Sequence, residues 1–291
     1  MPIIQNYLAP ASLSEALQLV AERNATILAG GTDLLPRWHR GLTVPPTAVV
    51  SLRCLADLCG IERARDEVRI GACTPLSVIA TDPIIASAAP VLGIAASRIA
   101  CSLIRNRATI GGNLCNASPA ADTAIPLLLL DAILDIACVG QAAVTTRDVQ
   151  IADFFRGPGK TVLQSGDLLT GIRFKPLPAE TIAAWDKFGT RPAMEIAVAA
   201  VGVALAFEGR TVAKARIGYG SVAPVPLRGH AAESQLVGKQ LSNDVVNECV
   251  AAARAEIAPI TDVRASADYR REVTGVLLRR MLQRAQHLRN G

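Results

Sequence analysis

The first thirty residues predict a helix, a strand and a tight turn in that order. In residues 12–23, apolar side chains recur at helical spacing behind Ser12, which can cap the helix. Residues 25–30, ATILAG, form a short apolar run, which predicts a buried strand that ends at a pair of glycines. The apolar face of the predicted helix consists of Leu13, Ala16, Leu17 and Val20.

Short helices and strands continue as far as residue 174. Thr32 can cap a helix over residues 33–40, and Gly41 then ends it. A helix is also predicted for residues 74–85, with Thr74 as its cap and Pro75 in the first helical position. The remaining apolar runs predict helices over residues 90–103 and 118–133 and strands over residues 48–52, 67–72 and 168–174.

The pattern changes after residues 175–180, KPLPAE. Long runs rich in valine and alanine follow and predict strands, and two amphipathic segments after them predict helices. The strands are expected at residues 196–209 and 212–224, and the helices at 243–257 and 265–285. This change places a domain boundary at residues 175–180. Because strands and helices mix without strict alternation, the predicted fold class is α+β.

The composition is that of a globular protein of about two domains. A chain of 291 residues that is 51% hydrophobic can bury one or two large cores. Its net charge of +5 is spread along the chain and only 3% of residues are aromatic, which argues against nucleic-acid binding. The N-terminus does not resemble a secretory signal and the longest apolar runs are too short to span a membrane, so we expect a cytoplasmic protein.

Seven cysteines are scattered through the chain without a C-x-x-C pair. An odd set of this kind argues against a disulfide framework, a zinc site or an iron–sulfur cluster held by this chain. The seven are Cys54, Cys59, Cys73, Cys101, Cys115, Cys138 and Cys249. The sequence therefore predicts no metal site.

Two glycine pairs carry the strongest chemical signal. The first lies in ILAGGTDLL, residues 27–35, and the second in ATIGGNLCNASPAADT, residues 108–123. Glycine allows a positive φ and lets a ligand approach backbone N–H groups, so each pair can form a phosphate cradle. Two cradles can hold the two phosphates of a dinucleotide, although neither pair fits G-x-G-x-x-G. The alternative is that each pair is a plain connecting turn.

Polar residues beside the glycine pairs suit the hydroxyl groups of a sugar. Asp33 follows the first pair, and it is expected in the first helical turn, pointing away from the phosphates. The others, which follow the second pair, are Asn113, Asn116, Ser118 and Asp122. Turn formation and helix capping are the alternative roles for each of them.

Four segments match one family in order and spacing. They are ILAGGTDLLP, IRNRATIGGNLCNASPAADT, GDLLTGIRF and KFGTRPAMEIAVAAVGVAL. Together they resemble the FAD-binding subunit of the xanthine dehydrogenase and carbon monoxide dehydrogenase family of molybdenum hydroxylases. The resemblance covers nearly the whole chain and implies a fold in two parts. An FAD-binding domain of the vanillyl-alcohol oxidase (PCMH) type would span residues 1–175, with subdomains at about 1–55 and 56–175, and a smaller C-terminal α/β domain, residues 176–291, would close over the isoalloxazine ring.

The resemblance also implies which residues touch a non-covalent FAD. The first glycine motif would line the pyrophosphate and ribityl chain, the second motif would form a second loop, and four residues would make single contacts. In that order they are Ile27, Leu28, Ala29, Gly30, Gly31, Thr32, Asp33 and Leu34; Thr109, Ile110, Gly111, Gly112 and Asn113; and Ile99, Asp122, Leu168 and Lys187.

Two residues near these motifs have competing interpretations. Lys187 near flavin N1 would stabilise the charge of the reduced ring and raise its potential, whereas the alternative is a surface lysine at a strand edge. Trp38, on the short helix after the first motif, is expected to serve packing. No residue needs to act as an acid, base or nucleophile.

The implied function is electron transfer by one subunit of a larger oxidoreductase. Molybdopterin would lie in a large partner subunit and two [2Fe–2S] clusters in a small one, in a dimer of heterotrimers. The flavin would exchange electrons with NAD, a quinone, ferredoxin or oxygen. The first motif is closest to the flavin subunit of 4-hydroxybenzoyl-CoA reductase, but the cysteine-rich insertion of that subunit is absent after the second motif. The alternatives are therefore an aromatic acyl-CoA reductase subunit, a non-redox assembly subunit with the same fold, and a free-standing FAD oxidase.

Overall fold

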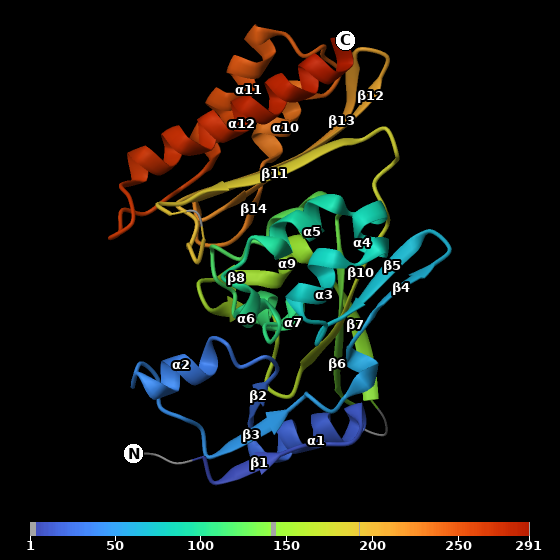
Figure 1. The fold of residues 1–291 in the computed structure, drawn as a ribbon, viewed down its shortest axis with the longest axis vertical. Coiled ribbons are helices and arrows are strands. Elements are labelled where there is room, and N and C mark those ends of the chain that lie inside the picture. The colour runs from blue at the N-terminus through green and yellow to red at the C-terminus, as the bar shows by residue number, and fades with distance from the viewer. Residues whose placement is uncertain (1–3, 141–143, 192, 291) are drawn as a thin grey trace.

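Three sheets are stacked along the long axis of the molecule (Figure 1). The computed structural model describes residues 4–140, 144–191 and 193–290. We call the three parts the N-terminal unit, the middle unit and the C-terminal unit, built on sheets within residues 6–51, 61–174 and 182–228. The predicted α+β character is evident, while the domain boundaries proposed above stay predictions.

The N-terminal unit is a small parallel sheet covered by one helix. Its strands run in the order β1 (Asn6–Leu8), β3 (Ala48–Ser51), β2 (Thr26–Leu28). Helix α1 (Leu13–Arg23) begins as predicted, because the Ser12 hydroxyl accepts a hydrogen bond from the Glu15 N–H at 3.2 Å. The helix buries Ala16, Leu17 and Val20. Strand β2 was expected to be buried but is only half-buried, because it borders a cavity.

Helix α2 (Leu34–His39) follows the first glycine pair and differs from the expected helix. Thr32 does not cap it; Asp33 occupies the N-cap position and its side chain makes no capping hydrogen bond. The helix ends near Gly41, whose φ of 68° suits glycine. None of its residues is buried. Figure 1 accordingly shows α2 beside the rest of the N-terminal unit and away from its sheet.

The middle unit is a five-stranded antiparallel sheet with short helices packed on it. The strand order is β4 (Ile61–Ala64), β5 (Glu67–Gly71), β10 (Leu168–Phe174), β6 (Ile133–Val139), β7 (Val144–Gln150). Its helices are α3 (Leu76–Thr81), α4 (Pro83–Ala88), α5 (Pro90–Ser97), α6 (Ser102–Arg105), α7 (Ile110–Cys115), α8 (Ala124–Leu129) and α9 (Ile151–Phe154), with a 3-10 turn η1 (Ala56–Leu58) and a hairpin of β8 (Phe155–Gly157) and β9 (Lys160–Thr161). The helices and the sheet share one large apolar core.

Three long helices predicted in this unit are shorter in the structure. The helix expected at 74–85 breaks at Asp82, because a residue before proline disfavours helical backbone, and Asp82 instead caps α4 by accepting from the Ile84 N–H at 2.8 Å. Thr74 is no cap, since its hydroxyl bonds the Gly60 backbone. The helix expected at 90–103 stops at Ser97, and the one expected at 118–133 is confined to α8.

The C-terminal unit is a four-stranded antiparallel sheet between two helical layers. The strands are β11 (Ile182–Phe188), β12 (Ala199–Glu208), β13 (Thr211–Gly220) and β14 (Leu227–Arg228), in that order. One face carries α10 (His230–Leu236), α11 (Asn243–Glu256) and α12 (Ala267–Asn290) (Figure 1). The other face packs on α8, where a Cβ added to Gly202 would lie 2.9 Å from Ile125. Because Gly202 has no side chain, α8 of the middle unit packs directly on the backbone of this sheet.

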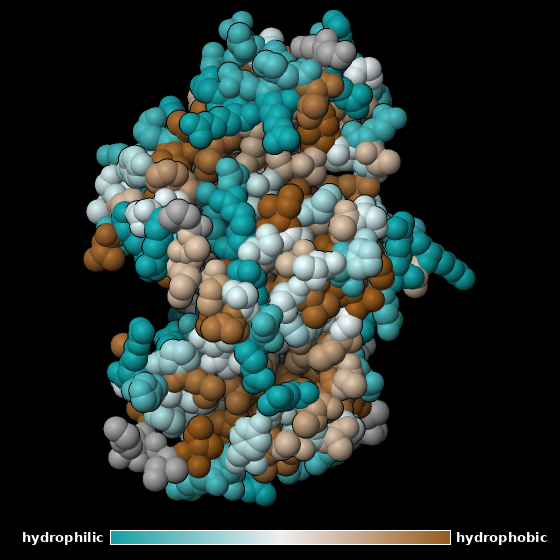
Figure 2. Space-filling model, viewed as in Figure 1, coloured by the Kyte–Doolittle hydropathy of each residue, from teal (hydrophilic) through white to brown (hydrophobic). Residues whose placement is uncertain are grey.

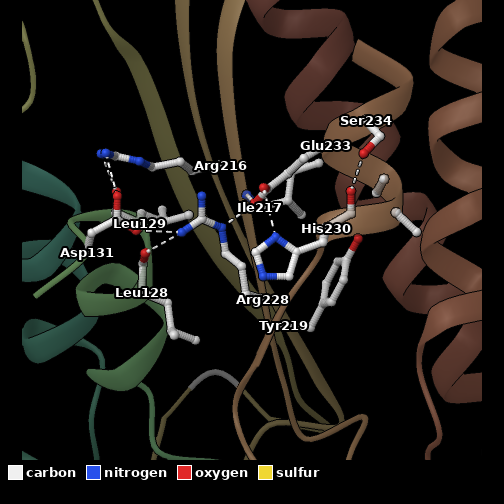
Figure 3. A network of polar contacts seen from close by, with 12 residues as sticks. Leu128, Leu129, Asp131, Arg216, Ile217, Tyr219, Arg228, His230, Glu233 and Ser234 are labelled. Carbon is white, nitrogen blue, oxygen red and sulfur yellow. Dashed lines mark hydrogen bonds and ion pairs between the residues drawn. The ribbon is translucent and has the colours of Figure 1, made fainter. Parts of the chain in front are cut away.

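A polar network joins the same two units beside α8 (Figure 3). Asp131, just after α8, accepts a hydrogen bond from Arg228 at 2.6 Å and forms an ion pair with Arg216 at 2.5 Å. Arg228 also pairs with Glu233, whose carboxylate accepts from the Ile217 N–H at 2.7 Å. His230 lies at the exposed edge of this network, 3.5 Å from Glu233.

We expect Arg228→Met to lower the free energy of unfolding by about 3 kcal/mol, because it leaves the buried Glu233 carboxylate without its cation. The Arg228 and Glu233 side chains are only 14% and 11% exposed. Chemical denaturation of the full chain measures the effect. Arg216→Met is the matched control: that side chain is 30% exposed and reaches only the half-exposed Asp131 and a carbonyl, so its loss should cost about 1 kcal/mol or less. Equal losses in the two variants would contradict this account of the network.

Candidate functional site

A cavity of about 630 Å³ lies between the N-terminal and middle units. Both glycine motifs line it, although nearly eighty residues separate them in the chain. Figure 2 shows the surface hollowed at the left edge, above the N-terminal unit. Of the seventeen residues proposed to touch the cofactor, thirteen line this cavity: Ile27, Ala29, Gly30, Gly31, Thr32, Asp33, Leu34, Ile99, Thr109, Gly111, Gly112, Asn113 and Leu168.

The first glycine motif presents a run of unpaired backbone donors to this cavity. Among the described residues, no hydrogen-bond acceptor is found for the N–H groups of residues 30–34. Gly31 turns the chain with a φ of 72°, a conformation that favours glycine. Consecutive N–H groups of this kind form an anion cradle. Because α2 is only six residues long, the cradle depends on these amides and not on a helix dipole.

Gly30 brings the two motifs into direct backbone contact. A Cβ at this position would lie 2.1 Å from the Arg107 carbonyl oxygen, closer than any real contact allows. The absence of a side chain is therefore required for the chain before the second motif to pack on the first. This contact joins the N-terminal unit to the middle unit at the floor of the cavity.

The second glycine motif was expected to be a loop, and the structure corrects this. Residues 110–115 form helix α7, capped by the Thr109 hydroxyl, which accepts from the Gly112 N–H at 3.1 Å. The Gly111 N–H donates to the Ala72 carbonyl at 2.8 Å. Both amides of this pair therefore already have acceptors, and Ile110 is fully buried in the middle core. This motif supplies a close-fitting wall of the cavity, whereas the first motif supplies the open donors.

Asp122 and Lys187 do not line the large cavity but bind each other. The Lys187 ammonium lies 2.5 Å from an Asp122 carboxylate oxygen, and the two side chains are 8% and 9% exposed. The alternative of a surface lysine is therefore wrong. The pair links β11 of the C-terminal unit to the segment between α7 and α8. Burial raises the pKa of the Asp122 carboxyl, and the lysine charge opposes this rise.

The second oxygen of Asp122 is buried and has no hydrogen-bond donor among the described residues. A buried carboxylate oxygen is costly to leave without a partner, so its presence indicates a donor that this chain does not supply. A sugar-alcohol hydroxyl is one such donor. This oxygen belongs to the ion pair with Lys187 and not to the lining of the large cavity, to which residues 30–34 contribute their open amides.

A smaller cavity of about 360 Å³ adjoins this pair on the C-terminal unit. Arg98 and Lys187 both line it, and Arg98 forms an ion pair with Asp186 of β11. The Arg98 guanidinium also stacks on Trp185, 5.4 Å from the ring centre. The next residue, Ile99, lines the large cavity. The two cavities are thus neighbours across the junction between the middle and C-terminal units.

Sequence reasoning missed the wall of the large cavity that residues 37–46 provide. The residues of this wall are Arg37, Trp38, Thr43, Val44 and Pro46. Trp38, which was expected to serve packing, is half-buried and also lines this cavity. The signal that could have identified it is an aromatic side chain on a six-residue helix directly after the first glycine motif. The last of the seventeen residues, Leu28, lies on β2 and packs beside Gly31.

A family model for the FAD binding domain in molybdopterin dehydrogenase matches residues 3–178. This chain belongs to that family. A model for the CO dehydrogenase flavoprotein C-terminal domain matches residues 184–285. The predicted fold of an FAD-binding domain followed by a C-terminal domain is thereby confirmed, as is the family to which the four motifs pointed.

Two relatives and one solved structure align with this chain along nearly its full length. A putative xanthine dehydrogenase FAD-binding subunit of Escherichia coli is 32% identical, with 96% of this chain and 95% of that protein covered. The carbon monoxide dehydrogenase medium chain of Afipia carboxidovorans is 34% identical, with 97% and 96% covered. The structure of reconstituted CO dehydrogenase from Oligotropha carboxidovorans superposes with a TM-score of 0.92 at 32% identity, covering 99% of each chain. The prediction of an oxidoreductase subunit is confirmed at the level of the family.

In the part of the chain that the structure describes, no group of three or more histidine, cysteine, aspartate or glutamate side chains is arranged to hold a metal ion. None of the described helices is long and apolar enough to cross a membrane. All seven cysteines are free thiols.

Proposed function

We propose that this chain carries FAD and transfers electrons between the [2Fe–2S] clusters of a partner subunit and an external acceptor, within a molybdenum hydroxylase. When bound, FAD supplies the exchange between one-electron and two-electron carriers. The observation that carries the proposal is the run of unpaired amides at residues 30–34 inside the 630 Å³ cavity. Membership of the FAD-binding family supports the same conclusion.

We assign the work of binding to three parts of the chain. Amides of residues 30–34 would hold the pyrophosphate. Helix α7 would form the opposite wall, and Arg107, which precedes this helix, packs on Gly30. Asp122 would accept a hydroxyl of the polyol chain with its unpaired oxygen. Lys187, on β11 of the C-terminal unit, is held by Asp122 of the middle unit, and its positive charge would favour a reduced, negatively charged ring. All seventeen residues given above remain our proposed cofactor contacts.

The partners follow from the family. We propose a large subunit with the molybdopterin and a small subunit with two [2Fe–2S] clusters, assembled as a dimer of heterotrimers. The "medium chain" name of the carbon monoxide dehydrogenase relative supports a three-subunit arrangement. The acceptor would be NAD, a quinone, ferredoxin or oxygen. A subunit of an aromatic acyl-CoA reductase is the second candidate, on the likeness of the first glycine motif.

The decisive experiment is flavin analysis of the purified chain. We expect a yellow protein that releases FAD, and not FMN, when it is denatured. The first glycine motif contains no histidine or cysteine for covalent attachment, and the second contains one cysteine, Cys115, at the end of α7. Flavin that stays attached to the polypeptide would contradict non-covalent binding. A colourless chain that also takes up no added FAD would favour the assembly subunit.

A further inference from the structure

Trp38 is a half-buried aromatic side chain that lies outside the apolar cores of the fold. It lies on α2, which has no buried residue, yet it forms part of the wall of the large cavity. Among the described residues, the stacked aromatic and cationic pairs all involve other side chains, so the Trp38 indole face has no partner of this kind. A large apolar ring that faces a cavity in this way is typical of a ligand contact.

Its position relative to the phosphate cradle is defined by the helix. Trp38 comes four residues after Leu34, the last of the unpaired amides, which is a rise of about 6 Å along a helix. Figure 1 places α2 on the N-terminal unit. Ile99, which also lines the cavity, belongs to the middle unit and follows Arg98, whose side chain forms an ion pair with Asp186 of β11. The cavity therefore has Trp38 of the N-terminal unit and Ile99 of the middle unit in its lining, together with the cradle residues 30–34.

The lining at Ile99 differs from the lining at Trp38. Ile99 and its neighbours give a broad apolar surface from several elements of the middle unit, which suits the larger, three-ring isoalloxazine. The neighbours are Leu76, Ile104, Leu163, Leu168 and Leu169. Trp38 offers one aromatic ring, and Thr43, Val44 and Pro46, which follow α2 in the chain, line the same cavity. A single indole face of this kind fits a smaller planar base with hydrogen-bonding edges.

We infer that the Trp38 indole stacks on the adenine base of FAD and makes the site selective for the dinucleotide over FMN. This inference rests on the proposed function, because it names the part of the same cofactor that α2 receives. Arg37, one residue earlier, is held 3.6 Å from Asp33 and is half exposed, so it does not compete for the ring face. The indole would therefore be the main adenine contact.

The test compares FAD and FMN binding to the full chain freed of flavin. We expect Trp38→Ala to raise the dissociation constant for FAD about tenfold, because it removes one base-stacking contact, and to leave that for FMN unchanged. Trp38→Phe should restore most of the FAD affinity. Leu42→Ala is the matched control, because this side chain lies just after the same helix, is 67% exposed and does not line the cavity; it should change neither constant.

A second readout uses the two tryptophans of the chain. In Trp185→Phe, Trp38 is the remaining indole, and AMP should quench its fluorescence. Three results would each overturn the inference: equal weakening of FAD and FMN affinity by Trp38→Ala, unchanged FAD affinity in that variant, or no quenching by AMP. None of them would contradict the proposal that the unaltered chain binds FAD. If the unaltered chain binds neither flavin, the proposed function fails as well.

Discussion

Gly30→Ala should abolish flavin retention. The new Cβ would lie 2.1 Å from the Arg107 carbonyl oxygen, and neither backbone can move without separating the two glycine motifs. We expect the purified variant to carry at most about a tenth of the normal FAD, because a loss of 1.4 kcal/mol in binding already lowers affinity tenfold. Overpacking at this junction should also lower the free energy of unfolding by about 1–3 kcal/mol. Flavin content per chain and chemical denaturation measure the two effects.

Gly93→Ala, in the middle unit, is the matched control. Gly93 lies inside α5, and a Cβ there would meet its nearest neighbour at an ordinary 3.4 Å. This variant should retain all its flavin and gain up to about 1 kcal/mol of stability from better helix propensity. If Gly30→Ala behaves like this control, the backbone contact between the motifs is not what shapes the site.

Lys187→Met should be the most destabilising change at the junction with the C-terminal unit. It leaves the buried Asp122 carboxylate without its cation, and breaking a buried ion pair of this kind costs about 3 kcal/mol. Unfolding of the full chain by denaturant at neutral pH measures this loss. Lys187→Met combined with Asp122→Asn should recover part of it, because the double variant has no buried charge to leave unpaired.

The pH dependence of this variant follows from the same carboxyl group. Burial already raises the folded-state pKa of Asp122 above its ordinary value, and removing Lys187 takes away the charge that opposes the rise. A carboxyl group with a raised folded-state pKa stabilises the fold below its unfolded pKa, and this contribution is lost as the pH rises through the folded-state pKa. The stability gap between the original chain and Lys187→Met should therefore widen as the pH rises from the ordinary titration range of a carboxyl group to neutral pH. A gap that narrows over this range would show that Asp122 is not the group responsible.

Local signals predicted several elements of this fold correctly. The Ser12 cap and the apolar face of α1 are both seen in the structure, as are strands β3, β5 and β10. These elements depend on cap chemistry and on side-chain periodicity within a few residues, which a sequence contains in full. The four motifs likewise pointed to the family that the comparisons confirm. Helix ends at Asp82 and Ser97 were missed, although the proline after Asp82 was a local warning.

The candidate site shows what the sequence alone could not decide. The sequence contained both glycine motifs, but only packing determines that Gly30 touches Arg107 and that the Gly111 amide is already bonded to the Ala72 carbonyl. In the same way, the sequence contained Lys187, and the fold placed it against Asp122, 65 residues earlier in the chain.

The physical reason is the range of the interactions. Helix caps, turn residues and apolar periodicity act between near neighbours, so the order of residues determines them. Whether an amide is open to a ligand or already bonded, and whether a charge is paired or exposed, depends on groups that the chain brings together from far apart. The sequence therefore determined which motifs this protein has, and the tertiary structure decided which of their atoms remain free to bind.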